Sequence, residues 1–452
     1  TYVGIPVFSA VQLQLNNDAF SIKRTFYRKF DTTVIDVGRI ISNSYANNNL
    51  GADFSIDILN FGFKVGEKNQ IHFGIGLEAY GNLLLTKNTL NFLLRGPGFF
   101  LDKNATEALS GNRIDMSVYG AASLGYAREI SEKFSVGGRV KFLSGFANLY
   151  TESSEVYLHI DNGYDPLITP YSYSLQPNIA LMGSFANSHP DSNLFSALRN
   201  VISDAADMSI GMPDLTSLGN NFGMGFDLGL TYQINDDILV GASISDIGYI
   251  NWNTGLKKVS SQGQNRSFVF SGVGSLNDIL NNEDFDINNV FGALKDSAID
   301  YLQLKENDTN FSSYRSRLRT SYNLSLFYDI SEKAQIGFMW NAQIGHQKNK
   351  TLTIAYTRFI TSNFSLCINN SIVNDNMINF GGGIALNAGA VQLYLIADKV
   401  SSFRVIDMRA FNVQFGLNVV LNRMEKATSK RRLAKDYTPM DKTGYVKDRW
   451  AY

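Results

Sequence analysis

The stretch that decides the fold is residues 323–345, NLSLFYDISEKAQIGFMWNAQIG. Its apolar side chains fall on every second residue before and after a short turn: Leu324, Leu326, Tyr328 and Ile330, then Ile336, Phe338, Trp340, Ala342 and Ile344. A period of two places alternate side chains on opposite faces of a strand. The stretch therefore predicts a β-hairpin with one apolar face and one mostly small or polar face. A soluble β-sandwich could contain such a hairpin, so its repetition along the chain becomes the test.

The hairpin does recur, because short polar turns separate alternating segments from end to end. The turns share Asn, Gly, Ser and charged residues, which suit tight hairpin turns. They are Gly66–Asn69, Ser131–Lys133, Asn235–Asp237, Ser331–Lys333, Thr361–Asn363 and Asn387–Gly389. In a closed up-and-down barrel with both termini on the turn side, six short turns separate fourteen strands.

We therefore predict an all-β fold, a transmembrane antiparallel up-and-down barrel of about fourteen strands. An even count is typical of single-chain bacterial barrels. The strands are expected near 5–15, 51–65, 70–84, 112–130, 134–149, 221–234, 238–251, 312–330, 334–347, 350–360, 364–374, 378–386, 390–399 and 408–421. Alternation also occurs inside 150–220 and 252–311, and one further spanning hairpin there would raise the count to sixteen.

Long connections lie on the side opposite the turns, at 16–50, 85–111, 150–220 and 252–311. In barrels of this class the short turns face the periplasm and the long loops face the exterior. Both termini are then expected in the periplasm. Amphipathic patterns predict short helices at Asp31–Tyr45, Asn193–Ala206 and Ile287–Tyr301. They would pack together as an external cap, or one would enter the barrel as a plug or dock a partner.

Composition agrees with such a barrel. Aromatic residues make up 12% of the 452 residues and charged residues 18%, and there are 38 glycines. No run approaches 18 apolar residues, so the sequence offers no helical membrane span. The net charge of −1 gives no reason to expect a nucleic-acid partner. The single cysteine, Cys367, cannot form an internal disulfide. A removed secretory signal, or a shortened sequence, would explain a chain that begins at Thr1.

The last thirty residues differ in character. Residues 423–452 contain nine Lys or Arg against four acids. We divide the chain into a barrel with its partly helical extracellular cap, 1–422, and a basic periplasmic tail, 423–452. The tail is a candidate docking segment for a partner protein, through its basic residues and its aromatic end: Arg431, Arg432, Lys435, Trp450 and Tyr452.

No arrangement typical of catalysis or metal binding stands out. The four histidines are not spaced as metal ligands, and His72 and His346 are expected in the lumen or at a rim. Asp115 and Asp227 are expected to face a wet lumen, and the acidic segment Asn281–Asp286 reads as a solvated loop. We predict no catalytic residue, cofactor or metal.

Two tryptophans are assigned to the outside. Trp340 belongs to the apolar face of its strand, where it would face lipid. Trp252, at a strand end, fits the aromatic girdle at a membrane interface.

One segment carries a resemblance. Residues 243–252 end in Asp246-x-Gly248-x-Ile250-x-Trp252, a pattern that resembles Bacteroidota outer-membrane barrels related to the long-chain fatty-acid transporter (FadL-like and PorV-like barrels). The opening Gly4–Ser9 and the helical first loop fit one branch of that group. The resemblance implies fourteen strands and the outer membrane of a Gram-negative bacterium. Asp246, Gly248 and Trp252 are the candidate family motif.

The resemblance leaves two functions open, because the wider group includes both accessory barrels of secretion machinery and transport barrels. We expect a non-enzymatic accessory subunit of an outer-membrane assembly for secretion or barrel insertion. Its partners would be membrane lipid and other proteins, bound through the cap loops and tail. The alternative is a passive transporter of a small hydrophobic compound. It predicts an apolar pocket under the cap and an exit where Gly381–Gly383 break a strand, although a wall bulge explains these glycines equally well.

Overall fold

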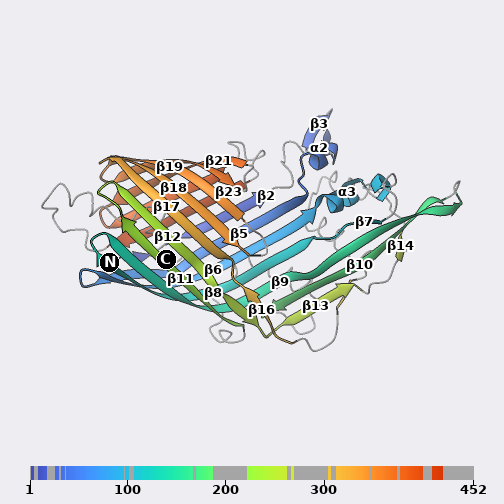
Figure 1. The fold of residues 1–452 in the computed structure, drawn as a ribbon, viewed down its shortest axis with the longest axis horizontal. Coiled ribbons are helices and arrows are strands. Elements are labelled where there is room, and N and C mark those ends of the chain that lie inside the picture. Colours follow the sequence, from blue (N-terminus) through green and yellow to red (C-terminus); the bar gives the residue numbers. More distant parts are fainter. Residues whose placement is uncertain are drawn as a thin grey trace.

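The computed structural model describes residues 2–4, 9–17, 26–29, 32–35, 37–95, 97–100, 106–165, 169–186, 221–261, 266–268, 304–306, 312–345, 349–373, 377–400 and 410–420. It is a closed antiparallel barrel of fourteen strands (Figure 1). In order around the wall these are β1–β2 (Tyr2–Gly4, Val11–Asn17), β5 (Asn47–Val65), β6 (Asn69–Thr86), β8 (Arg113–Ser131), β9 (Phe134–Asp165), β11 (Phe222–Gln233), β12 (Ile238–Trp252), β16–β17 (Tyr314–Arg317, Thr320–Ser331), β18 (Ala334–Ile344), β19 (Asn349–Thr361), β20 (Phe364–Val373), β21 (Met377–Ala388), β22 (Val391–Val400) and β23 (Ala410–Val420).

The first and last strands close the wall. Val11 pairs with Phe415 on β23 and with Ile56 on β5, so β2 lies hydrogen-bonded between them. Closure removes the free sheet edges that a bilayer cannot satisfy with hydrogen bonds. The predicted barrel and its fourteen strands are confirmed.

The outer surface is apolar, as the alternation predicts. Ile368 is 65% exposed and Trp340 is 37% exposed on this surface. Further outward residues are Leu124, Phe142, Phe226, Leu228, Leu230, Tyr232, Leu324, Leu326, Tyr328, Phe338, Leu352, Ile354, Tyr356, Leu366, Ile384, Leu386, Leu393 and Leu395. A belt of this size on a closed barrel is stable only against lipid.

The six predicted turns all occur, and together they form one end of the barrel, the turn rim. Backbone hydrogen bonds link each turn to the next hairpin. They run from Glu129 N to Lys68 O, Gln233 N to Lys133 O, Asp329 N to Asp237 O, Phe359 N to Lys333 O, Asn387 N to Asn363 O and Val420 N to Ala390 O, at 2.7–3.0 Å. Gly66 and Gly389 adopt φ values of 69° and 63° in their turns, which glycine tolerates best.

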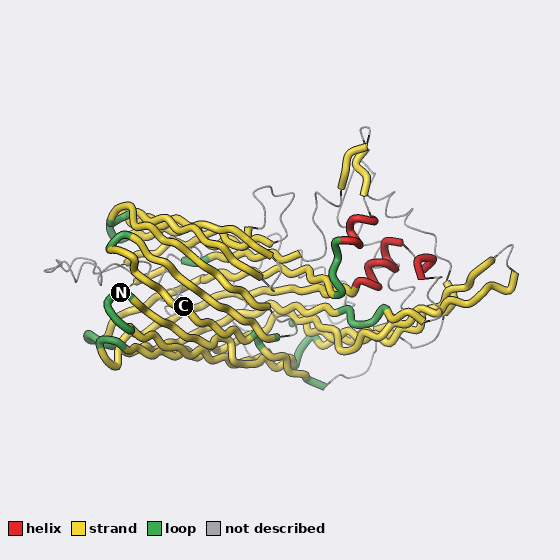
Figure 2. Tube along the Cα trace, turned by 45° about the horizontal axis from the view of Figure 1, so that its top comes forward, coloured by secondary structure: helices red, strands yellow, loops and turns green. Residues whose placement is uncertain are grey.

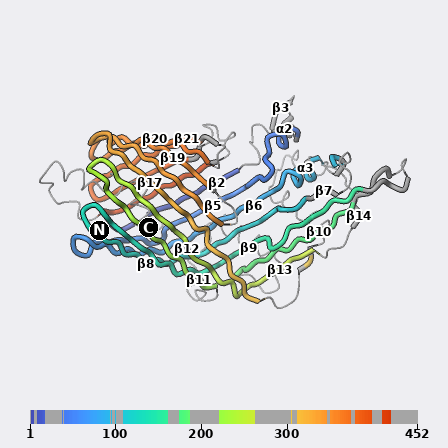
Figure 3. The backbone as a smooth tube through the Cα atoms, in the orientation of Figure 1, coloured from blue at the N-terminus to red at the C-terminus, as the bar shows by residue number. Residues whose placement is uncertain are grey.

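The opposite end, the loop rim, is uneven. Strands β18 and β20 have 11 and 10 residues, close to the ~9–11 that cross a bilayer. In contrast, β5, β6 and β8 have 18–19 residues and β9 has 32. Figure 3 shows these N-terminal strands running well beyond the C-terminal ones.

The strand predicted to end at residue 149 therefore continues to Asp165. Past Gly145 it leaves β11 and pairs with β10 (Thr169–Phe185). β13 (Leu256–Ser261) and β14 (Arg266–Phe268) pair with β10, β15 (Leu304–Glu306) with β13, and β7 (Thr106–Ala108) with β9. This sheet, called the extension below, lies beyond the barrel, so its hairpin does not add spanning strands.

Asn221 joins the extension to the barrel. Its side chain is 1% exposed and uses both ends. The Nδ2 group donates to Gly145 O and Ser184 Oγ, each at 3.2 Å, while Oδ1 accepts from Asn253 N at 2.7 Å and Thr254 N at 3.1 Å. Because one side chain holds backbone groups of two segments and the Ser184 hydroxyl of a third, it fixes the direction in which the extension leaves the barrel.

The helical cap differs from the prediction. Within 31–45 the helix α2 covers only Val37–Ser42, since residues 32–35 form strand β4 (Thr32–Ile35), paired with β3 (Phe26–Lys29). The predicted helices at 193–206 and 287–301 lie outside the described residues. Two unpredicted helices occur in the 85–111 connection, α3 (Lys87–Arg95) and η1 (Pro97–Phe100) (Figure 2).

The unpredicted helices have an apolar support. Phe100, which is 1% exposed, packs with Val156 and Leu158 of β9 and Leu175 of β10. One face of the extension is therefore covered by η1. In the part of the chain that the structure describes, no helix is long and apolar enough to cross a membrane.

The glycine run resolves as a bulge. Gly381 lies at the register shift between Phe380 and Gly382 in the pairing with β22, and β21 pairs with β20 from Met377 to Leu386. An added Cβ on Gly381 would press on the backbone of Ala397. These glycines bend the wall and do not break the strand.

Candidate functional site

The barrel encloses a cavity of about 430 Å³, lined from strands all around the wall. Its two sides differ in chemistry. On β5, β6, β8, β9, β11 and β12, called the charged wall, the lining includes ionisable side chains: Asp53, Asp57, Glu78, Arg139, Lys141, Asp227 and Asp246. On β17–β23 and β2, called the amide wall, it is mainly uncharged: Gln12, Gln14, Asn16, Asn323, Asn341, Gln343, Thr351, Asn412 and Gln414, with Asp398 as the one carboxylate.

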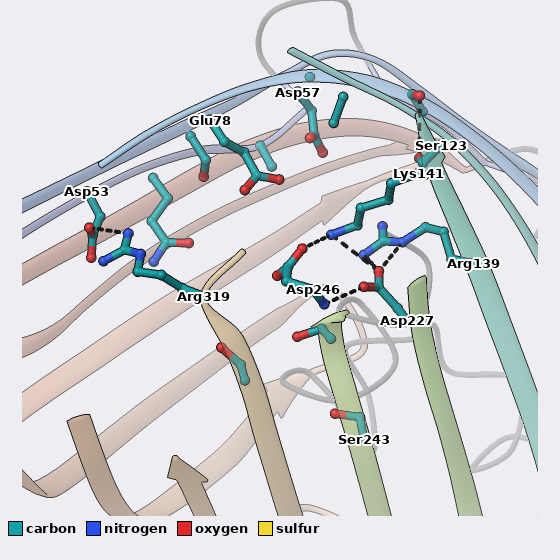
Figure 4. Close-up of a pocket in the computed structure, with 18 of the residues that line it drawn as sticks. Asp53, Asp57, Glu78, Ser123, Arg139, Lys141, Asp227, Ser243, Asp246 and Arg319 are labelled. Carbon is teal, nitrogen blue, oxygen red and sulfur yellow. Dashed lines mark hydrogen bonds and ion pairs between the residues drawn. The ribbon is translucent and has the colours of Figure 1, made fainter. Parts of the chain in front are cut away.

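Four side chains of the charged wall form a compact ion-pair network (Figure 4). Arg139 is paired in register with Asp227, and its Nη2 lies 2.6 Å from Asp227 Oδ2. Lys141, one inward position further along β9, places Nζ 2.5 Å from Asp246 Oδ1 and 3.3 Å from Asp227 Oδ2. Arg139 and Lys141 face the same side because they are two residues apart on one strand. Each cation is thereby held by a carboxylate.

A backbone irregularity brings Asp246 into this network. The register of β11 and β12 shifts between Phe226 and Leu228, so Asp227 lies opposite a bulge. Asp246 has φ 60°, the only positive φ of a non-glycine residue in the described chain, and its N–H donates to Asp227 Oδ1 at 2.8 Å. Asp tolerates this left-handed conformation better than most residues. The bulge turns a second carboxylate toward Lys141.

The other residues of the predicted motif have packing roles. An added Cβ on Gly248 would collide with the backbone of Met224 on β11, so only glycine fits beside the bulge. Trp252 is 0% exposed, its ring lies against Gly145, and its Nε1 donates to Ser316 Oγ at 2.8 Å. The assignment of Trp252 to an interfacial girdle is therefore wrong.

Trp252 belongs to an apolar layer inside the barrel, next to the cavity. The layer joins side chains from β6, β8, β9, β12 and the β16–β17 junction: Tyr80, Tyr119, Leu143, Ile250, Trp252 and Leu318. Gly145 and Gly225 leave room in this layer for the side chains of Trp252 and Leu318.

Arg319 spans the lumen at the edge of this layer. The wall breaks between β16 and β17, where Leu318 N donates to Gly248 O and Thr320 N donates to Leu318 O, each at 3.0 Å. From this break, Arg319 Nη2 reaches Asp53 Oδ1 at 2.6 Å, although β6, β8, β9, β11 and β12 separate the two strands around the wall. Its Cζ also lies 3.8 Å from the centre of the Tyr80 ring. The Arg319 side chain thus crosses the lumen of the barrel (Figure 4). It is called the Arg319 bar below.

Neutral hydrogen bonds join side chains of β17–β20 in the amide wall. Asn341 Nδ2 donates to Asn323 Oδ1 at 2.6 Å, and the hydroxyls of Thr353 and Ser371 lie 2.9 Å apart. Amides both donate and accept, so neighbouring side chains satisfy one another without fixed charge.

The sequence placed only part of this site. Asp227 faces the lumen as expected, Asp115 is buried, and His72 lines the cavity. The tail residues and His346 lie outside the described residues. Arg139, Lys141, Glu78 and Arg319 were missed, although a charged residue inside an alternating strand is an available signal. Among the described residues, no three His, Cys, Asp or Glu side chains converge to hold a metal ion.

The fold is similar to solved transport barrels. The Pseudomonas putida toluene transporter TodX is 11% identical, with 92% of this chain and 89% of that chain covered and a TM-score of 0.34. A Pseudomonas aeruginosa FadL homologue is 9% identical, with 91% and 87% covered and a TM-score of 0.37. The KdgM porin is 8% identical, with 70% and 98% covered and a TM-score of 0.19. These values are too low to carry a functional argument.

No curated protein matches the chain. A family model does, over residues 1–398, which include all of the charged wall and all of the amide wall except β23. The chain therefore belongs to DUF5723, described as a family of unknown function.

Proposed function

We propose that the protein is a passive transport barrel of a Gram-negative outer membrane, with the turn rim toward the periplasm. The supporting observation is the cavity of about 430 Å³ inside a closed barrel with an apolar exterior. A purely structural barrel of this diameter would stabilise itself best by filling its interior. A polar interior around empty space is typical of barrels that pass solutes.

The polar lining of the cavity favours a different class of solute from the one expected from the sequence. The alternative from sequence was a hydrophobic compound in an apolar pocket under the cap. The cavity of the described residues instead presents carboxylates, guanidinium, ammonium and amide groups. Desolvating these groups beside an apolar solute costs free energy that no new contact returns. We therefore assign the transport to small polar solutes.

Arg319 is assigned as the gate of this path. It crosses the lumen to Asp53 beside the apolar layer, so it narrows the way between the cavity and the loop rim. Replacing its long side chain by alanine removes the Arg319 bar and leaves the strands in place.

The test is solute-induced swelling of proteoliposomes containing the full chain or its Arg319→Ala variant. We expect uptake of a small polar solute by the wild type and several-fold faster uptake by the variant. Arg315→Ala is the matched control, because Arg315 lies only four residues away but contacts Tyr249 and Asn251 on an exposed surface. Absence of uptake by both wild type and Arg319→Ala, with both barrels folded, would refute transport.

A second candidate is the accessory subunit expected from sequence, favoured by the extension. A transport path does not need a sheet in which β9 alone spans 32 residues, and such a sheet offers surface to a partner. A mild-detergent pull-down from outer membranes with mass spectrometry tests this. Deleting 423–452 would release partners held by the tail while leaving a heat-modifiable barrel, and retention of all partners would refute tail docking.

A further inference from the structure

The cavity lining contains more acids than bases. Its bases are Arg139, Lys141 and Arg319, and its acids are Asp53, Asp57, Glu78, Asp227, Asp246 and Asp398. Every base is already paired with Asp53, Asp227 or Asp246. Asp57 and Glu78 take no part in these pairs.

Asp57 and Glu78 are held by hydrogen bonds instead. Asp57 accepts a hydrogen bond from Asn60 Nδ2 at 3.0 Å, and Glu78 accepts one from the Tyr119 hydroxyl at 2.7 Å. Both donors are neutral, and neither carboxylate lies within ion-pair distance of a cation among the described residues. Figure 4 shows the two side chains next to each other on the same side of the lumen.

His72 provides an independent sign of a missing donor. Asn60 donates its Nδ2 hydrogen to Asp57, so its Oδ1 must accept from His72 Nε2, 2.9 Å away. The Nε2 atom then carries the hydrogen and Nδ1 of the neutral ring is an acceptor. His72 is 5% exposed and its Nδ1 has no hydrogen-bond partner. A buried acceptor left unsatisfied costs free energy.

The strand positions beside these acceptors are occupied by glycine. On β6, the inward positions between His72 and Glu78 are Gly74 and Gly76, and Asp57 is paired with Gly76. An added Cβ on Gly76 would lie 3.2 Å from Asp57 Oδ1, and one on Gly74 would lie 3.1 Å from the His72 ring. Glycine at these two positions therefore keeps other side chains away from Asp57 and His72, which line the cavity together with Glu78.

We propose that this cavity binds a small organic cation with primary ammonium groups, received by Asp57 and Glu78 on the wall that also holds the unsatisfied Nδ1 of His72. An ammonium group offers three hydrogen-bond donors and a positive charge. It would therefore be the cationic partner that Asp57 and Glu78 do not have. The proposal rests on the transport function above for its biological role, but the binding site can be tested separately.

The probes are 1,4-diaminobutane, 1,4-butanediol and succinate, which share four carbons and differ in end-group charge. Calorimetric titration of the full chain in detergent measures binding, and liposome swelling measures permeation. We expect the diamine alone to bind, and to permeate about tenfold faster than the diol, because the two carboxylates attract its positive charge. Succinate should permeate slowest.

The variants are Asp57→Asn and Glu78→Gln, singly and together, with Glu152→Gln on the extension as the control. The double variant should lose diamine binding and bring the diamine-to-diol ratio close to one, while Glu152→Gln keeps both. If the double variant fails a heat-modifiability test of folding, the single variants replace it. Each of them should lower part of the diamine-to-diol permeation ratio.

The outcomes separate the two proposals. Diamine binding that the variants abolish, without permeation of any probe, supports the cation site and refutes transport. Equal permeation of all three probes by the wild type, without diamine binding, refutes the cation site and leaves transport standing. Neither binding nor permeation refutes both.

Discussion

The charged wall and the amide wall line the same cavity, but different interactions hold their side chains in place. In the charged wall, Lys141 and Arg139 are locked by carboxylates at 2.5–2.6 Å. In the amide wall, Asn341 and Asn323 share a neutral hydrogen bond. Removing one member of a buried ion pair leaves an uncompensated charge, whereas a lost neutral hydrogen bond leaves only a dipole. The electrostatic character of the cavity is therefore set by one wall.

The largest expected effect on stability comes from removing the lysine at the centre of the charged wall. Lys141→Met leaves Asp246 without its cation beside Asp227, which Arg139 still holds, and we expect a loss of about 3 kcal/mol in the free energy of unfolding. The matched change in the amide wall, Asn341→Leu, should cost about 1 kcal/mol. Urea titration in lipid vesicles measures both. Equal losses would contradict the division into two walls.

The next effect tests the apolar layer beside the charged wall. Gly145→Ala places a methyl group against the Trp252 ring and should cost about 1–3 kcal/mol through overpacking. Gly81→Ala is the control, because its added Cβ comes no closer than 3.8 Å to Met116. We expect that control within about 0.5 kcal/mol of the wild type. A harmless Gly145→Ala would show that Trp252 is not packed as described.

A smaller effect separates charge from conformation at the bulge. Both Asp246→Asn and Asp246→Ala remove the carboxylate, but asparagine tolerates the positive φ and alanine does not. The alanine variant should be less stable by about 1 kcal/mol more in the same titration. Indistinguishable variants would mean that the backbone of Asp246 relaxes without cost.

The smallest effect compares the lumen with the extension. Lys258 Nζ lies 2.6 Å from Glu152 Oε2, but the Glu152 side chain is 45% exposed. Glu152→Gln should change stability by less than about 1 kcal/mol, and the change should disappear in high salt. A salt-independent loss comparable with that of Lys141→Met would contradict the distinction between buried and exposed pairs.

Much of the barrel could be predicted from local pattern. Leu324 to Ile344 alternate outward and inward as expected, because the two-residue period depends only on extended backbone. The turns were placed correctly since Gly, Asn and Ser meet local φ/ψ demands. Helix α3 was missed because its stability depends on packing rather than on its own short sequence. Trp252 was misplaced because a strand-end position does not say whether a ring faces lipid or the lumen.

The sequence by itself determined the strands, the turns and the alternation of side chains within each strand, because these follow from periodicity over a few residues. Only the tertiary structure decided which inward residues meet. Arg319 and Asp53 lie 266 residues apart and touch because the wall closes and kinks at Leu318. Asp246 reaches Lys141 only through the bulge opposite Asp227. Register, closure and bulges are set by the pairing of the whole sheet, so the charges could be seen in the sequence while their partners could not.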